Sequence, residues 1–110
     1  MLKIVTTVGT SLLENFKDPG GPAFRNFYEK IEDKSASEYS HYEAEIKTFL
    51  PLMVKYISND PSAASAEVKS CIKIREKYSE TATVYLISSD TFASVLAAEA
   101  IDKYLNSLGG

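Results

Sequence analysis

The residues of this chain best suited to chemistry form a short polar run that follows the apolar, β-branched segment Leu2–Val8, which is expected to be a buried strand. The candidate ligand-binding residues in this run are Gly9, Thr10, Ser11, Leu12 and Asn15. Glycine lets a phosphate approach the main chain closely and accepts a positive φ angle. If a helix begins near Leu12, the amides of its first turn and its partial positive charge face an anion. The sequence therefore predicts a phosphate site that is built from amides and hydroxyls and needs no lysine.

A second polar run follows another apolar segment with strand character, Thr83–Ile87. Its candidate ligand-binding residues are Ser88, Ser89, Asp90 and Thr91. Because the ligands of open α/β sheets bind beyond the carboxyl ends of the strands, two strands that each end in a polar loop predict one shared binding rim. Asp90 has an alternative role as the N-cap of the helix that follows, and both roles stay open at this point.

Purely structural roles are the alternative for each of these signals. A Gly-Thr-Ser turn after a strand is often only a tight connection to a helix. Glu67 is expected on a helix, in a solvated or capping role, and Cys71 is expected in the core. The single histidine, His41, lies in a polar stretch and is not expected to do chemistry. One histidine and one cysteine do not make a usual zinc site, and the glycine-rich nucleotide fingerprints are missing from the sequence, so no metal or cofactor is expected.

The composition is that of an ordinary globular domain and argues against a polyanionic partner. The chain has 110 residues, with 12 lysines and arginines, 15 aspartates and glutamates, and a net charge of −3. A duplex-binding domain normally carries a basic face, so duplex DNA is not expected as a partner. The single cysteine excludes an intramolecular disulfide and fits a reducing compartment, so we expect a cytoplasmic protein. The apolar run at the start is too short to span a membrane, and no membrane partner is expected.

Hydrophobic periodicity predicts four helices in the remainder of the chain. Their expected ranges are Ala23–Lys34, Tyr39–Ile57, Pro61–Tyr78 and Phe92–Leu108, with a turn-rich interruption over Phe16–Pro22 before the first and a stop at Gly109–Gly110 after the last. Pro51 predicts a kink or a helix boundary near Phe49 and Leu50, because proline removes an interior hydrogen bond. Asp60, in front of a proline, predicts an N-cap.

These elements define an α/β protein with a Rossmann-like parallel sheet flanked by helices, in which two recognisable strands are joined by a long helical crossover. Doubly wound sheets have about five or six strands, and an isolated pair buries little apolar surface. We therefore expect residues 1–110 to be the N-terminal part of a single domain, with no second domain, or a chain whose sheet is completed by another copy of itself.

Three blocks of the sequence resemble the CARF domains, the CRISPR-associated Rossmann-fold sensors. Thr6–Asn15 is similar to their first-strand signature, in which Val-Gly-Thr-Ser-Leu-Leu is followed two residues later by asparagine. Ser65–Ser70 resembles the Ser-Ala-Glu block that precedes the second strand in one CARF subfamily. Leu86–Thr91 and Ala97–Ala100 resemble the Ser-Asp-Thr turn and alanine-rich helix of that subfamily, whereas Phe16–Asp60 carries no such block.

The resemblance implies a specific function in type III CRISPR antiviral defence. CARF domains are homodimers that bind cyclic oligoadenylate, here cyclic tetra- or hexa-adenylate, in a cleft lined by the first-strand loops of both subunits, and binding switches an attached effector. Some members cleave the ring with a hydroxyl residue of the first loop, which Ser11 matches, and a basic residue that would lie beyond Gly110. We therefore expect binding with little turnover by this chain. The alternatives are a ring nuclease and a Rossmann-like subdomain that binds another nucleotide or mediates assembly.

Overall fold

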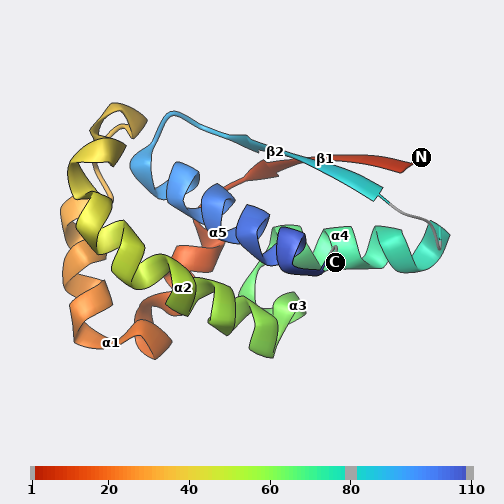
Figure 1. The fold of residues 1–110 in the computed structure, drawn as a ribbon, viewed down its shortest axis with the longest axis horizontal. Helices are drawn as coiled ribbons and strands as arrows, with labels where there is room; N and C mark the ends of the chain where they lie inside the picture. The colour runs from red at the N-terminus through yellow and green to blue at the C-terminus, as the bar shows by residue number, and fades with distance from the viewer. Residues whose placement is uncertain (1, 79–81, 109–110) are drawn as a thin grey trace.

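The computed structural model describes residues 2–78 and 82–108. The elements, in chain order, are β1 (Leu2–Val8), α1 (Ser11–Ile31), the 3-10 helix η1 (Ala36–Tyr42), α2 (Glu43–Asn59), α3 (Pro61–Ala64), α4 (Ala66–Tyr78), β2 (Ala82–Ser88) and α5 (Phe92–Leu108). The two strands pair in parallel, and the α-helices lie on one side of the sheet (Figure 1). The predicted α/β class and the predicted parallel pair are confirmed. No described helix is both long and apolar enough to cross a membrane.

The two strands are covered on one face only, which corrects the expectation of a buried strand. Side chains alternate along a strand, and in β1 Ile4 and Val8 are buried while Val5 is 64% exposed. In the register of the sheet Val5 pairs with Tyr85, and Tyr85 and Ile87 are also about half exposed. The nearly continuous apolar run that indicated burial on both faces therefore leaves an apolar outer face on the described part of the chain.

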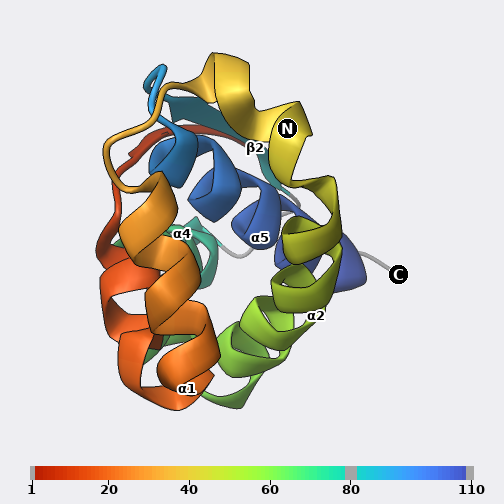
Figure 2. The same ribbon diagram turned by 90° about the vertical axis from the view of Figure 1, so that its left-hand side faces the viewer.

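Helix α5 lies in the middle of the fold, between the sheet on one side and α1 and α2 on the other, whereas α4 packs directly against β1 (Figure 2). Its buried side includes small residues that let neighbouring helices approach closely: Ala93, Ala97 and Ala100. Large residues of the same helix, Phe92 and Ile101, are fully buried. The predicted helix over Phe92–Leu108 is confirmed, and its predicted stop at Gly109–Gly110 lies outside the described residues.

An aromatic cluster joins α1, α2 and α5. The ring of Phe24 is fully buried and lies 4.7 Å from the ring of Phe16 and 5.3 Å from that of Phe49, both edge-to-face. Phe27 stacks on Phe49 at 5.3 Å and contacts Phe92 edge-to-face at 6.2 Å. Such offset and edge-to-face arrangements add to the hydrophobic gain, so this cluster is the centre of the helical half of the core.

The predicted interruption before Ala23 is much narrower than expected. α1 runs from Ser11 to Ile31, and within it only Gly21, with φ 76° and ψ −174°, has non-helical torsion angles. A positive φ is a conformation that glycine adopts readily, so Gly21 allows the kink between the two halves of α1. Pro19 lies inside the helix because the carbonyl of Asn15, which lacks its helical donor, accepts a hydrogen bond from the Tyr56 hydroxyl at 3.4 Å.

The other helix boundaries also differ from the prediction. α2 begins at Glu43 because the preceding residues, 36–42, form the 3-10 helix η1. The helix boundary predicted near Phe49 and Leu50 is absent, because α2 continues through Pro51 to Asn59. Pro51 lies on the exposed side of the helix, where water can donate to the carbonyl that proline leaves without a hydrogen-bond donor. The predicted Asp60 cap is confirmed, since its carboxylate accepts a hydrogen bond from the Ala63 amide at 3.4 Å.

Candidate functional site

The sheet register brings the two polar loops to one edge. Val8, the last residue of β1, pairs with Ser88, the last residue of β2. The buried hydroxyl of Ser94 donates to the Val8 carbonyl at 2.7 Å and accepts a hydrogen bond from the Ser89 amide at 3.0 Å. We call this edge, formed by residues 9–15 and 88–91, the polar rim. Sequence analysis missed Ser94; its signal is a serine among the apolar positions of α5.

The carboxylate of Glu67 occupies the position on the polar rim that was predicted for an anion. Its Oε1 accepts a hydrogen bond from the Gly9 amide at 3.1 Å, and its Oε2 accepts one from the Ser11 hydroxyl at 3.3 Å and one from the Ser65 hydroxyl at 2.8 Å. Burial raises the pKa of Glu67, but hydrogen bonds from its own backbone, Gly9, Ser65 and Ser11 outweigh this effect, so the pKa lies below its ordinary value. The site therefore holds a negative charge supplied by the protein itself.

Ser65 explains why Glu67 reaches the polar rim. The chain is extended at Ser65, with φ −149° and ψ 129°, so that the predicted helix over residues 61–78 is divided into α3 and α4. The Ser65 hydroxyl accepts a hydrogen bond from the Val68 amide at 3.3 Å and so caps α4. Glu67 thus lies in the first turn of a helix that begins beside the loop after β1. Its expected place on a helix is confirmed, but Ser65 is the cap of α4, and the Glu67 carboxylate bonds the loop after β1 instead.

The other polar side chains of the first loop also have partners within the protein. The Asn15 carboxamide donates to the carbonyls of Ala64 at 3.0 Å and Ala63 at 3.4 Å, which ties α1 to the end of α3. The Tyr28 hydroxyl donates to the carboxylate of Glu14 at 2.8 Å, and burial together with this hydrogen bond raises the pKa of Tyr28. A ligand that uses these groups has to replace existing contacts. The first amides of α1 have no partner within the helix, as at any helix start.

The second loop is held by the start of α5. The Thr91 hydroxyl accepts a hydrogen bond from the Ser94 amide at 3.3 Å and lies 3.0 Å from the Ser89 hydroxyl, so Thr91 rather than Asp90 is the cap of α5. The Asp90 carbonyl accepts a hydrogen bond from the Ala36 amide, which fixes the loop against the start of η1. Asp90 is exposed.

The charge of the polar rim comes from carboxylates. Glu14 and Asp90 belong to the rim, and the carboxylate of Glu67 reaches it from α4. Glu14 pairs with Lys17 at 3.0 Å, whereas no ion pair joins Glu67 or Asp90 to a lysine or arginine in residues 2–78 and 82–108. Carboxylates accept hydrogen bonds from hydroxyl and amino groups. The arrangement thus offers amides and serine or threonine hydroxyls to an anion, and carboxylates to the sugar hydroxyls or amino groups of the same ligand.

Two other chemically capable residues lie away from the polar rim. His41 is exposed on η1, and its ring lies 3.7 Å from the carboxylate of Glu38. Cys71 is a free, buried cysteine on α4, and burial raises the pKa of its thiol, with a smaller contribution from Glu67. The expectation that Cys71 is buried in the core is confirmed.

No protein-family model matches this chain, and no curated protein matches it. Its function therefore has to be argued from the residues and the geometry of the polar rim.

Proposed function

We propose that the polar rim binds a nucleotide with phosphodiester groups and that, in line with the resemblance to CARF domains, this ligand is cyclic tetra- or hexa-adenylate. The pairing of Val8 with Ser88 carries the proposal, because it brings two polar loops and the start of α1 to one edge of the sheet. In a Rossmann-like sheet this edge, beyond the carboxyl ends of the strands, is where nucleotides bind.

The ligand phosphate takes the place that the Glu67 carboxylate occupies in the free protein. A phosphate oxygen can accept the same two hydrogen bonds, from the Gly9 amide and the Ser11 hydroxyl, with the first-turn amides of α1 behind them. Displacing Glu67 costs free energy, and the bond to Ser65 retains its carboxylate close to the rim. There the carboxylate is available to a ribose hydroxyl or an adenine amino group.

Titration calorimetry with cyclic tetra-adenylate and cyclic hexa-adenylate tests this function. We expect saturable binding of at least one ring, weakened about tenfold in Ser11→Ala because a hydrogen bond to a charged group is lost. Ser58→Ala is the matched control, because Ser58 lies on α2 and its hydroxyl only donates to the Val54 carbonyl. Absence of heat with both rings contradicts the proposal, and equal affinities for Ser11→Ala and the unchanged protein show that the loop is misassigned.

We propose binding rather than ring cleavage for this chain. The Ser11 hydroxyl donates to Glu67, and Glu67 and Asp90 supply negative charge at the rim, so the developing charge of a phosphorane gains no stabilisation from them. Thin-layer analysis of labelled ring after incubation distinguishes the two activities. An intact ring is expected, and a linear product shows that the chain is a ring nuclease.

Assembly is a second candidate function, favoured by the uncovered apolar face of the sheet. Val5, Tyr85 and Ile87 are adjacent on this face and 47–64% exposed, whereas parallel sheets normally have both faces covered. We propose a second copy of the chain as the occupant, because a two-fold axis across the strands places apolar residues on apolar residues and, with the strands of the two copies antiparallel, keeps the Lys3 side chains at opposite ends of the contact.

Sedimentation velocity tests the assembly. We expect the unchanged protein to dimerise and Val5→Lys to weaken the dimer at least tenfold, because it places a charge in an apolar contact. Leu52→Lys is the matched control, since Leu52 is 49% exposed on α2, away from the sheet. A monomer at all concentrations, or equal effects of the two substitutions, contradicts this assignment.

A further inference from the structure

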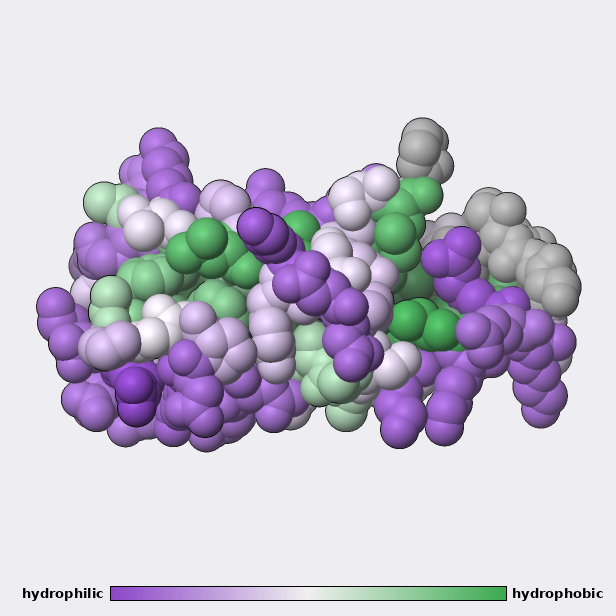
Figure 3. Space-filling model, turned by 90° about the horizontal axis from the view of Figure 1, so that it is seen from below, coloured by the Kyte–Doolittle hydropathy of each residue, from purple (hydrophilic) through white to green (hydrophobic). Residues whose placement is uncertain are grey.

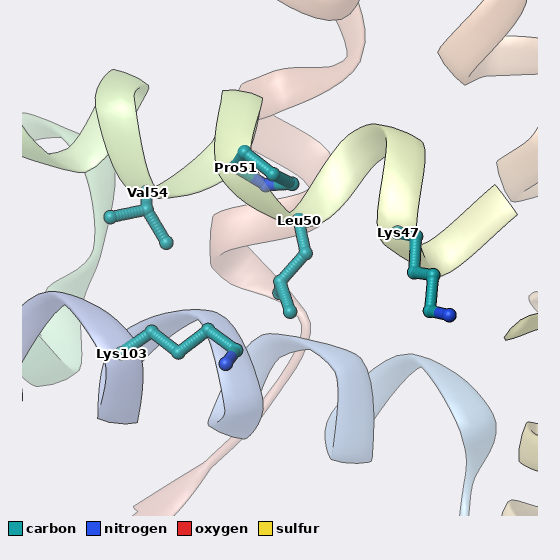
Figure 4. A pocket seen from close by; sticks show the side chains of 5 residues that line it. All are labelled: Lys47, Leu50, Pro51, Val54 and Lys103. Carbon is teal, nitrogen blue, oxygen red and sulfur yellow. The ribbon is translucent and has the colours of Figure 1, made fainter. Parts of the chain in front are cut away.

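An apolar furrow runs along the junction of α2 and α5, far from the polar rim in sequence and sharing no residue with it. It contains an open hollow of about 450 Å³ lined by Lys47, Leu50, Pro51 and Val54 of α2 and by Lys103 of α5. Figure 4 shows Leu50 and Val54 pointing from α2 toward α5, with Lys47 and Lys103 on either side of Leu50. The floor is therefore apolar, and the two ammonium groups flank it.

The furrow continues into a second hollow toward η1. This hollow, of about 370 Å³, shares Lys47, Leu50 and Lys103 with the first. Its other lining residues are Tyr39, Ser40, Glu43, Ile46 and Glu99. The carboxylates that face the furrow thus lie at the η1 end, together with Ile46 and Tyr39, and among the described residues no carboxylate lines the end formed by Leu50, Pro51 and Val54.

Lys103 is left without its expected ion pair. It follows Glu99 by four residues on α5, the spacing at which a helical Glu–Lys pair forms. The Tyr39 hydroxyl donates to the Glu99 carboxylate instead, and within the described ranges no ion pair joins Lys103 to a carboxylate. The charge of Lys103 therefore faces the furrow while its methylene groups cover apolar surface.

Lys47 is held only weakly. Its ammonium lies 3.2 Å from the carboxylate of Glu43, but both side chains are more than 70% exposed, and such exposed pairs contribute little. An anionic ligand can therefore displace the Glu43 carboxylate from the Lys47 ammonium and bind the ammonium groups of Lys47 and Lys103 together. This gives a chain of net charge −3 a local site where two cations meet an apolar floor.

We propose that this furrow binds a small amphiphilic carboxylate, a medium-chain fatty acid, with its head between Lys47 and Lys103 and its chain over Leu50 and Val54. The volume of the hollow lies in the range of about 300–1,000 Å³ that is usual for small ligands, and its apolar lining with a few charged groups is typical of such sites. The side of the molecule seen from below is largely hydrophilic, with separate hydrophobic areas (Figure 3). A compact ligand suits the furrow better than a broad apolar partner.

Methyl NMR with sodium decanoate, kept below its micelle concentration, tests the site. We expect saturable shifts of the Leu50 and Val54 methyl signals and an affinity at least tenfold lower in Lys47→Met/Lys103→Met, which retains the apolar stems and removes both charges. The double variant Lys30→Met/Lys73→Met, at exposed positions on α1 and α4, makes the same change in net charge away from the furrow. It is expected to bind decanoate within about twofold of the unchanged protein.

Three outcomes overturn the proposal. They are equal affinity of the Lys47→Met/Lys103→Met variant and the unchanged protein, equal shifts with decyltrimethylammonium in place of decanoate, and shifts that avoid the methyl groups of Leu50 and Val54. Because the substituted lysines are exposed, the variant is expected to fold, and its unchanged circular dichroism and unfolding midpoint verify this. The result does not depend on whether the polar rim binds a nucleotide.

Discussion

Phe24→Ala is expected to lower the free energy of unfolding by about 3–5 kcal/mol. The Phe24 ring has no exposed surface and contacts Phe16, Phe27, Tyr28 and Phe49, which belong to both halves of α1 and to α2. Truncation removes the transfer free energy of the ring and leaves a cavity between α2 and the two halves of α1. Domains of this size have about 5–15 kcal/mol of stability in total, so the variant is expected to be partly unfolded near physiological temperature.

Urea unfolding followed by circular dichroism measures this effect. Tyr78→Ala is the control, because Tyr78 is an aromatic residue that is 54% exposed, and its loss is expected to change the free energy of unfolding by no more than about 0.5 kcal/mol. If Phe24→Ala costs less than about 1 kcal/mol, or no more than the control, the aromatic cluster is not the centre of the core.

The elements that the sequence predicts well are those whose signal is local. The β-branched run Leu2–Val8 and the periodic stripe in Phe92–Leu108 each specify one element without reference to the rest of the chain, and the structure has both at these bounds. The neighbouring position of the two polar loops follows from the same information, since parallel strands end at the same edge. Thr91 as the cap of α5 is also a local signal, but Asp90 beside it is equally suitable by residue type.

The elements that the sequence predicts poorly depend on contacts between distant residues. Pro19 and Gly20 indicate a turn, yet α1 continues past them because Tyr56 of α2 supplies a donor to the carbonyl that proline leaves free. Glu67 and Gly9 are 58 residues apart, and nothing in either segment alone shows that they meet. Apolar residues such as Val5 predict a strand but do not show which of its faces is covered.

Glu67→Ala is expected to lower the free energy of unfolding at pH 7 by about 2 kcal/mol, because one carboxylate satisfies the Gly9 amide and the hydroxyls of Ser11 and Ser65. The part of this effect that depends on the charge of the carboxylate is expected to be lost at low pH. The pKa of Glu67 in the folded protein lies below the ordinary value of 4.5, so its contribution is present above that value and is lost as the pH falls through the folded-state pKa.

Urea unfolding at pH 7 and at pH 3 measures this dependence. The unchanged protein and Glu29→Gln, which removes a charge at an exposed position of α1, are expected to lose part of the contribution of Glu67 between these two pH values, because pH 3 lies below the ordinary pKa of 4.5. Glu67→Gln is expected to lack this part of the pH dependence. Glu67→Gln also separates stability from ligand binding. A neutral side chain at position 67 holds the Gly9 amide and the Ser11 hydroxyl less tightly than the carboxylate does, so it competes less with a ligand for these two groups. A ring that binds at the polar rim is therefore expected to bind Glu67→Gln more tightly than the unchanged protein. If Glu67→Gln matches Glu29→Gln in both pH dependence and ring affinity, the Glu67 carboxylate neither stabilises the loop after β1 nor competes with a ligand for it.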